Sequence, residues 1–184
     1  MKYIVLILAL LALVDTASVM FNKNEWVKRL EVLASRKTKY RAQFPNNVLL
    51  FDGTYWWCDC NNLLKGLFNG RDIYDYTPGR YTWPLTNTGD IGCEQMIGKC
   101  SDVSTNFKAL KEGEPRVLWL QGHIGTYIGK TVNGKYNVIE CTPAWGGGVI
   151  YSWVDSDGTR RREKGGPSIA VWKKHGKPTL WVSY

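Results

Sequence analysis

Apolar residues recur at three- and four-residue spacing in two stretches of the first half of the chain. The stretch at 24–36 has Asn22 or Asn24 available as an N-cap. The second begins after Asp59 and ends before Gly70, a residue type that favours the left-handed conformation that closes helices. The apolar positions are Trp26, Val27, Leu30, Leu33 and Ala34 in the first stretch and Leu63, Leu64, Leu67 and Phe68 in the second. Both patterns predict an amphipathic helix.

From Val117 onward, β-rich segments separated by turn residues predict strands. The expected strands are 117–121, 123–130, 136–142, 148–153 and 168–173. The segment 71–104 has no clear period, and we interpret it either as a binding loop or as a set of short elements. Helices that precede strands indicate one α+β domain, with N-terminal helices packed on a central antiparallel β-sheet.

The chain starts with a short basic segment, an apolar run from Tyr3 to Val14 and then small residues. This layout is typical of a secretory signal peptide, and the run is too short to span a bilayer comfortably. We expect residues 1–18 to be removed and 19–184 to form a single secreted domain without stable membrane insertion.

The formal net charge of +8 favours anionic polymers as partners, such as bacterial cell-wall material or acidic glycans. Nucleic acid is a less suitable partner because the basic residues are scattered, apart from 160–162 and 173–174. The oligomeric state is not predicted.

Five cysteines in an exported chain leave at least one thiol free or paired between molecules. A loop closed by Cys93 and Cys100 is plausible, and Cys58 with Cys141 is the remaining pairing. A zinc site is the structural alternative, but the cysteine spacing is not one that tetrahedral sites commonly use. The cysteines it would need are Cys58, Cys60, Cys93 and Cys100. We predict no metal and no cofactor.

Cys60 is the candidate nucleophile. Asp59 is a good N-cap, which places Cys60 in the first helical turn, where unpaired N–H groups stabilise a thiolate and later an oxyanion. A thiol attacks efficiently only as thiolate, and an imidazole can take its proton. Cys58, in contrast, is expected to lie before the helix.

His123 is the candidate base, because the second histidine, His175, lies in a charged segment that we expect to be a solvated turn. Alternation puts His123 and Gly125 on one face of a strand, and the glycine leaves room for a substrate or a helix end.

Glu140 is the candidate partner of the ring N–H of His123, and would fix the tautomer. A tight turn at Asn133-Gly134 would pair Glu140 with Tyr127, too far along the strand from His123. A bulge or a wider loop between Lys130 and Lys135 must therefore shorten the distance, and without one Glu140 is only a surface charge.

These segments resemble the NlpC-type family of papain-like cell-wall peptidases. Asp59-Cys60 before an apolar helix is similar to the family's Asp-Cys-Ser-Gly-Leu signature, and 122–129 is close to its His-Val-Gly-Ile-Tyr-Ile-Gly strand. The segment 110–114 resembles the Leu-x-x-Gly-Asp lead-in, and 138–140 ends where the family carries its third catalytic residue. Asn61-Asn62 departs from the signature, and the family's upstream tyrosine has no clean match among Tyr40 and Tyr55.

The resemblance implies a papain-like hydrolase that cuts peptidoglycan stem peptides next to a D-glutamyl linkage, with Cys60, His123 and Glu140 as the catalytic residues. For substrate binding we select residues beside the nucleophile and the base, because aromatic side chains can stack on sugars or line a groove. These are Asp59, Tyr55, Trp57 and Gly122. Two alternatives remain open: a CHAP-type N-acetylmuramoyl-L-alanine amidase, and a catalytically inactive wall-binding module.

Overall fold

A computed structural model describes residues 21–42, 49–78 and 87–184. The expected signal peptide at 1–18 lies outside these residues. Within the described part of the chain, no helix has both the length and the apolar character needed to cross a membrane.

Within the described ranges, three α-helices precede most of the strands, and helices before strands is the order that the sequence predicts. Helix α2 (Lys23–Ala34) is capped by Asn22, whose side chain accepts from the N–H groups of Asn24 and Glu25. Helix α3 (Cys60–Phe68) follows its N-cap Asp59. Helix α4 (Cys93–Gly98) lies in the segment without a clear period, which is therefore a set of short elements where it is described.

The main sheet is antiparallel and has eight strands in the order β11-β10-β9-β8-β7-β6-β12-β5. Its strands are β5 (Ser101–Ser104), β6 (Arg116–Leu120), β7 (His123–Val132), β8 (Tyr136–Thr142), β9 (Gly148–Val154), β10 (Thr159–Arg161), β11 (Ser168–Val171) and β12 (Lys174–Lys177). The five predicted strands are present, whereas β5, β10 and β12 were not expected. The α+β class is therefore confirmed.

Two small sheets complete the fold. Strands β2 (Thr38–Tyr40), β4 (Trp56–Cys58) and β3 (Leu50–Phe51) form one, with β4 in the middle. Strands β1 (Phe21–Asn22) and β13 (Val182–Ser183) pair in parallel and join the two ends of the described domain. Short 3-10 turns lie between strands that are consecutive in sequence: η2 (Phe107–Ala109) between β5 and β6, and η3 (Ala144–Gly146) between β8 and β9.

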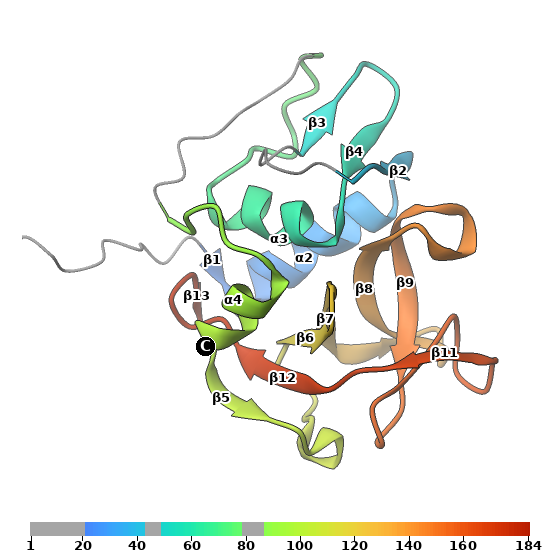
Figure 1. The fold of residues 1–184 in the computed structure, drawn as a ribbon. Coiled ribbons are helices and arrows are strands. Elements are labelled where there is room, and N and C mark those ends of the chain that lie inside the picture. Colours follow the sequence, from blue (N-terminus) through green and yellow to red (C-terminus); the bar gives the residue numbers. More distant parts are fainter. Residues whose placement is uncertain (1–20, 43–48, 79–86) are drawn as a thin grey trace, which may run out of the picture.

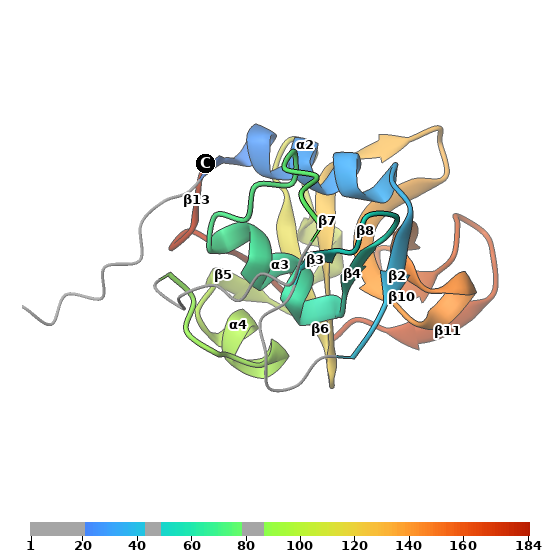
Figure 2. The ribbon, with the colours of Figure 1, turned by 90° about the horizontal axis from the view of Figure 1, so that it is seen from above.

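The core has two parts. The larger part lies between the helices and the sheet: α3 packs against β7 and β8, α2 packs against β8 and β9, and α4 packs against β6 and β12 (Figure 1). Seen from above, α3 lies between α2 and α4 (Figure 2). The smaller part gathers Leu118, Val138 and Trp172 around Phe107. This arrangement sets the start of α3 against the sheet.

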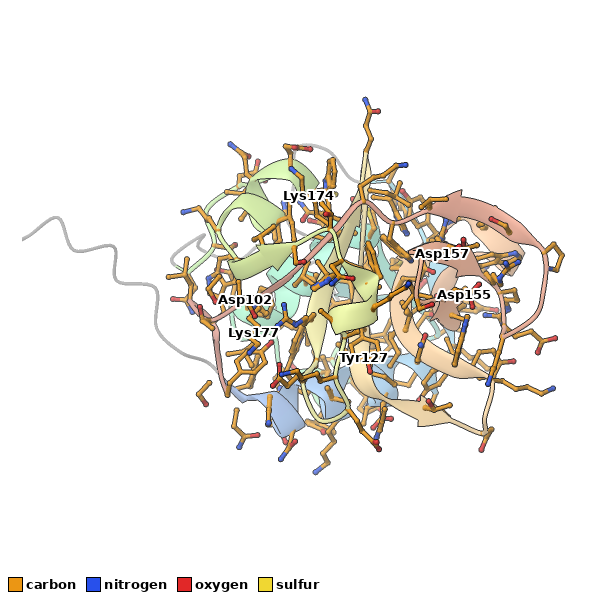
Figure 3. The ribbon with its side chains drawn as sticks, turned by 90° about the horizontal axis from the view of Figure 1, so that it is seen from below. Asp102, Tyr127, Asp155, Asp157, Lys174 and Lys177 are labelled. Carbon is orange, nitrogen blue, oxygen red and sulfur yellow. The ribbon has the colours of Figure 1, made fainter. Side chains whose placement is uncertain are left out.

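The expectation of a solvated turn at His175 is wrong. His175 lies in β12 with none of its surface exposed, and it contacts the Arg116 guanidinium at 3.2 Å from Nδ1. Arg116 pairs with Asp102, and Lys177 Nζ lies 3.8 Å from the same carboxylate (Figure 3). Charged lysines lie close to His175 in sequence, but its ring packs against Phe107, with 5.2 Å between centroids, and its Nε2 lies 3.1 Å from the Asn106 carbonyl oxygen.

Candidate active site

Cys60 is the first residue of α3, directly after β4. The Asp59 side chain accepts from the Asn62 N–H at 2.7 Å, so the helix begins where the sequence predicts. The Cys60 side chain is nearly buried, with 6% of the residue exposed. A sulfur at this position lies beside the unpaired N–H groups of the first turn, which favour an anion.

His123 and Glu140 are in contact: His123 Nε2 lies 2.5 Å from Glu140 Oε2. The register that permits this contact shifts between Tyr127 and Val132, and Val132 pairs with Tyr136 around a turn of three residues. Tyr127 therefore faces Val138 and not Glu140. Of the two irregularities that the sequence allows, the bulge brings the pair together: the register shift in β7 sets Glu140 opposite Gly125, whereas the three-residue turn alone would set it opposite Ile128.

Glu140 is fully buried and has two further partners that the sequence did not indicate. Arg160 donates to both carboxylate oxygens, at 3.1 Å from Nε and 2.6 Å from Nη2, and Ser152 donates to Oε1 at 2.5 Å. Burial alone would raise the pKa of Glu140, but the hydrogen bond from His123 and the charge of Arg160 outweigh it, and the pKa lies below its usual value. Glu140 is therefore an ionised carboxylate inside the protein.

Besides Glu140, the His123 ring contacts Cys60 through a hydrogen bond and Trp172 through ring stacking. Burial works against the charged ring, yet hydrogen bonds with Cys60 and with Glu140 raise the pKa of His123 to about 9. Since Nε2 contacts Glu140, Nδ1 is the ring nitrogen left for the sulfur. The ring stacks on Trp172 with 5.4 Å between centroids.

The room beside Gly125 is occupied by the protein itself. A Cβ at Gly125 would lie 3.0 Å from the Trp172 ring and 3.2 Å from the Glu140 Cβ. The expectation that this glycine makes space for a substrate or a helix end is therefore wrong. Gly125 lets Trp172 and Glu140 approach the strand that carries His123.

Cys93 faces the nucleophile: its Sγ lies 3.8 Å from Cys60 Sγ. This hydrogen bond and burial raise the pKa of the Cys60 thiol, whereas His123 lowers it, and the same hydrogen bond lowers the pKa of Cys93. The contact between the two sulfurs thus favours the negative charge on Cys93, whereas His123 favours it on Cys60, and the pair is suited to holding one negative charge rather than two.

The expected link between Cys93 and Cys100 is wrong, because both are free thiols that face different partners. Cys100 Sγ donates to the Met96 carbonyl at 3.4 Å, on the other end of α4 from Cys93. Cys58 and Cys141 are also free, with their sulfurs 3.2 Å apart. A zinc site would need four of these thiols together, but Cys60 faces Cys93, Cys58 faces Cys141, and Cys100 faces the Met96 carbonyl.

A hollow of about 240 Å³ opens beside the nucleophile. Its lining residues are Tyr40, Asp59, Cys60, Asn61, Asn62, Lys65, Asp90, Gly92, Cys93 and Gly122. Of the four residues selected for substrate binding, Asp59 and Gly122 line this hollow, and Tyr55 and Trp57 do not. Lys39 Nζ lies over both aromatic rings instead, 4.1 Å and 5.3 Å from their centroids.

Tyr40 is the tyrosine that lines this hollow. Burial, followed by the neighbouring Cys60 and Asp59, raises the pKa of Tyr40 to about 12, so its hydroxyl remains a hydrogen-bond donor at neutral pH. A larger hollow of about 410 Å³ lies between α2 and the loop before β6, and neither Cys60 nor His123 lines it.

No protein-family model, curated protein or solved structure matches this chain. In the described ranges, histidine, cysteine and carboxylate side chains form no group of three or more that could hold a metal ion. Sequence reasoning left Tyr40 unassigned, and the residues that it did not place at the site are Cys93, Ser152, Arg160 and Trp172. Arg160 belongs to a run of three arginines, and its contact with the buried Glu140 distinguishes it from Arg161, which lies in the same strand but binds Asp155.

We expect the charged His123 to stabilise the fold in a defined pH window. Its folded pKa of about 9 lies above the 6.5 of an unperturbed histidine, so the stabilisation is complete below about pH 6.5 and is lost as pH rises through 9. At about 1.4 kcal/mol per pKa unit the loss amounts to about 3 kcal/mol. Denaturant unfolding of the native protein and of His123→Asn from pH 6 to 10 measures it. A native protein whose stability follows that of His123→Asn across this range would contradict the prediction.

Proposed function

We propose that this chain is a secreted papain-like cysteine peptidase that hydrolyses the stem peptides of bacterial peptidoglycan at a D-glutamyl linkage. The observation that carries the proposal is the contiguous set of Cys60, His123 and Glu140: a thiol at a helix N-terminus, an imidazole and a buried carboxylate. This is the arrangement that nucleophilic thiol catalysis requires. The resemblance of the surrounding motifs to NlpC-type peptidases supports the choice of substrate, as does the net charge of +8.

In the proposed reaction, the Cys60 sulfur attacks the scissile carbonyl carbon and forms a thioester as the C–N bond breaks. His123 holds the thiol proton on Nδ1 and delivers it to the leaving amine. A water molecule, deprotonated by the same nitrogen, then hydrolyses the thioester and regenerates the thiol. Glu140 accepts the Nε2–H throughout, which stabilises the imidazolium and keeps Nδ1 directed at the sulfur.

The oxyanion of each tetrahedral intermediate needs hydrogen-bond donors near the sulfur. The first-turn N–H groups of α3 are one source, and the Tyr40 hydroxyl, which lines the same hollow as Cys60, is the second that we propose. Asn61 and Asn62 add side-chain amides to the wall of the hollow. This polar lining suits a peptide substrate better than an apolar one.

The experiment that tests the proposal is mass spectrometry of purified peptidoglycan incubated with the native protein and, in parallel, with Cys60→Ala. A peptidase exposes a new amine inside the stem peptide. Release of the first alanine's amine from the lactyl group would instead identify an amidase, and tight binding without any fragment would identify a wall-binding module. Cleavage that persists in Cys60→Ala would refute the thiol mechanism.

A further inference from the structure

Arg160 binds the buried Glu140 through two hydrogen bonds, and its guanidinium also contacts a threonine and two tryptophans. Nη2 also donates to Thr142 Oγ1 at 3.0 Å. Its Cζ lies 4.9 Å from the Trp145 ring centroid and 5.6 Å from that of Trp172, and only 6% of the residue is exposed. Packing between two indoles leaves the guanidinium little freedom, so the carboxylate is clamped in one orientation.

The carboxylate needs a permanent counter-ion because its other partner changes charge during the proposed reaction. His123 is an imidazolium after it takes the thiol proton and neutral after it delivers that proton. Glu140 has no exposed surface, and an unpaired buried carboxylate tends to take up a proton. A guanidinium is charged at every working pH, so Arg160 can keep Glu140 ionised when His123 is neutral.

We propose that Arg160 is a positioning residue for the imidazole, acting through Glu140. A Glu140 that stays ionised accepts the Nε2–H of His123 in both charge states of the ring, so Nδ1 faces Cys60 in each of them. Ser152 occupies a further lone pair of Oε1 and leaves Oε2 to His123 and Arg160. The catalytic part of this inference rests on the proposed function, whereas the effect on the ring does not.

The charged and titratable groups around His123 come from several elements. Glu140 lies on β8, Arg160 on β10 and Cys60 on α3, and Cys93 on α4 contacts the Cys60 sulfur. Tyr40 and Asp59 lie beyond Cys60 and line the hollow with it. Among these groups Arg160 is the permanent cation, so its removal lets the site keep a proton to higher pH.

The test is the titration of the His123 ring by nitrogen NMR in the full chain. We expect Arg160→Met to shift the His123 titration by about one pH unit or more, because His123 and Glu140 then share their proton without a neighbouring cation. His175, the second histidine, contacts Arg116 instead and serves as an internal reference that should not move. Arg161→Met is the matched control, because Arg161 pairs with Asp155 at 2.6 Å and not with Glu140.

Activity supplies the second readout. We expect kcat on peptidoglycan to fall by roughly 10- to 100-fold in Arg160→Met, with partial recovery in Arg160→Lys, because a misplaced general base costs rates of this order. Should Arg160→Met fail to fold, Arg160→Gln, which keeps a donor without the charge, takes its place with the same expectations. A folded variant whose His123 titrates as in the native protein would overturn the proposal.

The two proposals fail separately. A native protein that never cleaves peptidoglycan, but whose His123 titration moves in Arg160→Met, removes the proposed function alone. An active enzyme whose His123 titration is unchanged in Arg160→Met removes the role of Arg160 alone.

A second inference concerns the thiols in the hollow beside α3. Cys60 and Cys93 both line it, with their sulfurs 3.8 Å apart, and Cys93 is the more exposed of the two. A disulfide requires the sulfurs to approach to about 2 Å, so oxidation must draw the two side chains together from their present 3.8 Å. We infer that a low-molecular-weight disulfide oxidises this pair to a Cys60–Cys93 disulfide, which withdraws the nucleophile.

The oxidation proceeds by two exchanges. The Cys93 thiolate attacks one sulfur of the small disulfide, forms a mixed disulfide and releases one small thiolate. The Cys60 thiolate then attacks Cys93 Sγ and releases the second small thiolate. Two protein thiols are oxidised, one small disulfide is reduced to two thiols, and the two protons lost by the cysteines are taken up by those thiols.

Non-reducing peptide mapping after incubation with oxidised glutathione tests this inference without any activity assay. We expect a Cys60–Cys93 crosslink in the native protein that dithiothreitol reverses. In Cys93→Ser we expect a stable glutathione adduct on Cys60. A native protein that keeps glutathione on either cysteine, or that crosslinks only Cys58 to Cys141, would overturn it.

Discussion

Replacement of Cys60 by alanine is expected to abolish peptidoglycan hydrolysis, with a loss of about 10⁴-fold or more in kcat. The sulfur forms the covalent bond to the substrate in the proposed reaction, and no neighbouring group on the same helix turn can take its place. Cys93 lies 3.8 Å away but contacts no histidine. Release of stem-peptide fragments over time measures the effect.

Cys100→Ala is the matched control for this experiment. Cys100 is a buried thiol that donates to the Met96 carbonyl and does not line the hollow beside Cys60. We expect it to hydrolyse peptidoglycan at the native rate. Equal rates for Cys60→Ala and Cys100→Ala would exclude Cys60 as the nucleophile.

Replacement of Glu140 by alanine is expected to lower both stability and activity. The change leaves Arg160 buried without its carboxylate, which typically costs 3–5 kcal/mol, on the order of half the stability of a small domain. It also removes the acceptor of the His123 N–H, so we expect kcat to fall by about 10²- to 10⁴-fold. Denaturant unfolding and hydrolysis of peptidoglycan measure the two effects.

Two further variants separate the charge of Glu140 from its packing. Glu140→Ala combined with Arg160→Met should recover part of the lost stability but none of the activity, because no buried cation is then left unpaired. Glu25→Gln removes a carboxylate that pairs with Arg29 on the partly exposed face of α2, and should cost less than about 1 kcal/mol. A Glu140→Ala protein as stable as Glu25→Gln would contradict the buried ion pair.

The sequence predicts the site where local rules decide the geometry. An N-cap aspartate followed by an apolar stripe places Cys60 in the first turn of α3 without any knowledge of the tertiary fold. The requirement for an irregular hairpin also follows from residue spacing, because a tight turn would set Glu140 opposite Tyr127. In both cases the interaction lies within one helix or one pair of neighbouring strands.

The missed residues depend on contacts between distant segments. Arg160 is buried because its guanidinium binds Glu140 and Thr142 and packs beside Trp145 and Trp172, whereas its arginine neighbours gave it the pattern of a charged surface. Cys93 faces Cys60 across a contact between α3 and α4, whereas its closeness in sequence to Cys100 pointed to a local loop. Neither contact produces a hydrophobic period or a residue spacing that could be recognised in a single sequence.

The short strands were missed for a related reason. Strands β5, β10 and β12 have four residues or fewer, and two of them consist largely of basic residues. Patterns of alternation need more residues than this to stand out. Their hydrogen-bonding partners, and not their own side chains, determine their conformation.

The register shift in β7 determines which residue of β8 lies close enough to His123 to bind its imidazole. Gly129, at φ 70°, is part of the looped-out backbone, and a side chain there would lie 3.0 Å from the Glu114 nitrogen. If this hairpin were closed tightly, the residue beside Gly125 would be Thr142 and not Glu140, two positions later in the chain. The number of residues between a histidine and its acidic partner therefore depends on bulges and turn length, and it need not be the same in two related chains. A comparison with a relative should align the paired strands first and count residues afterwards.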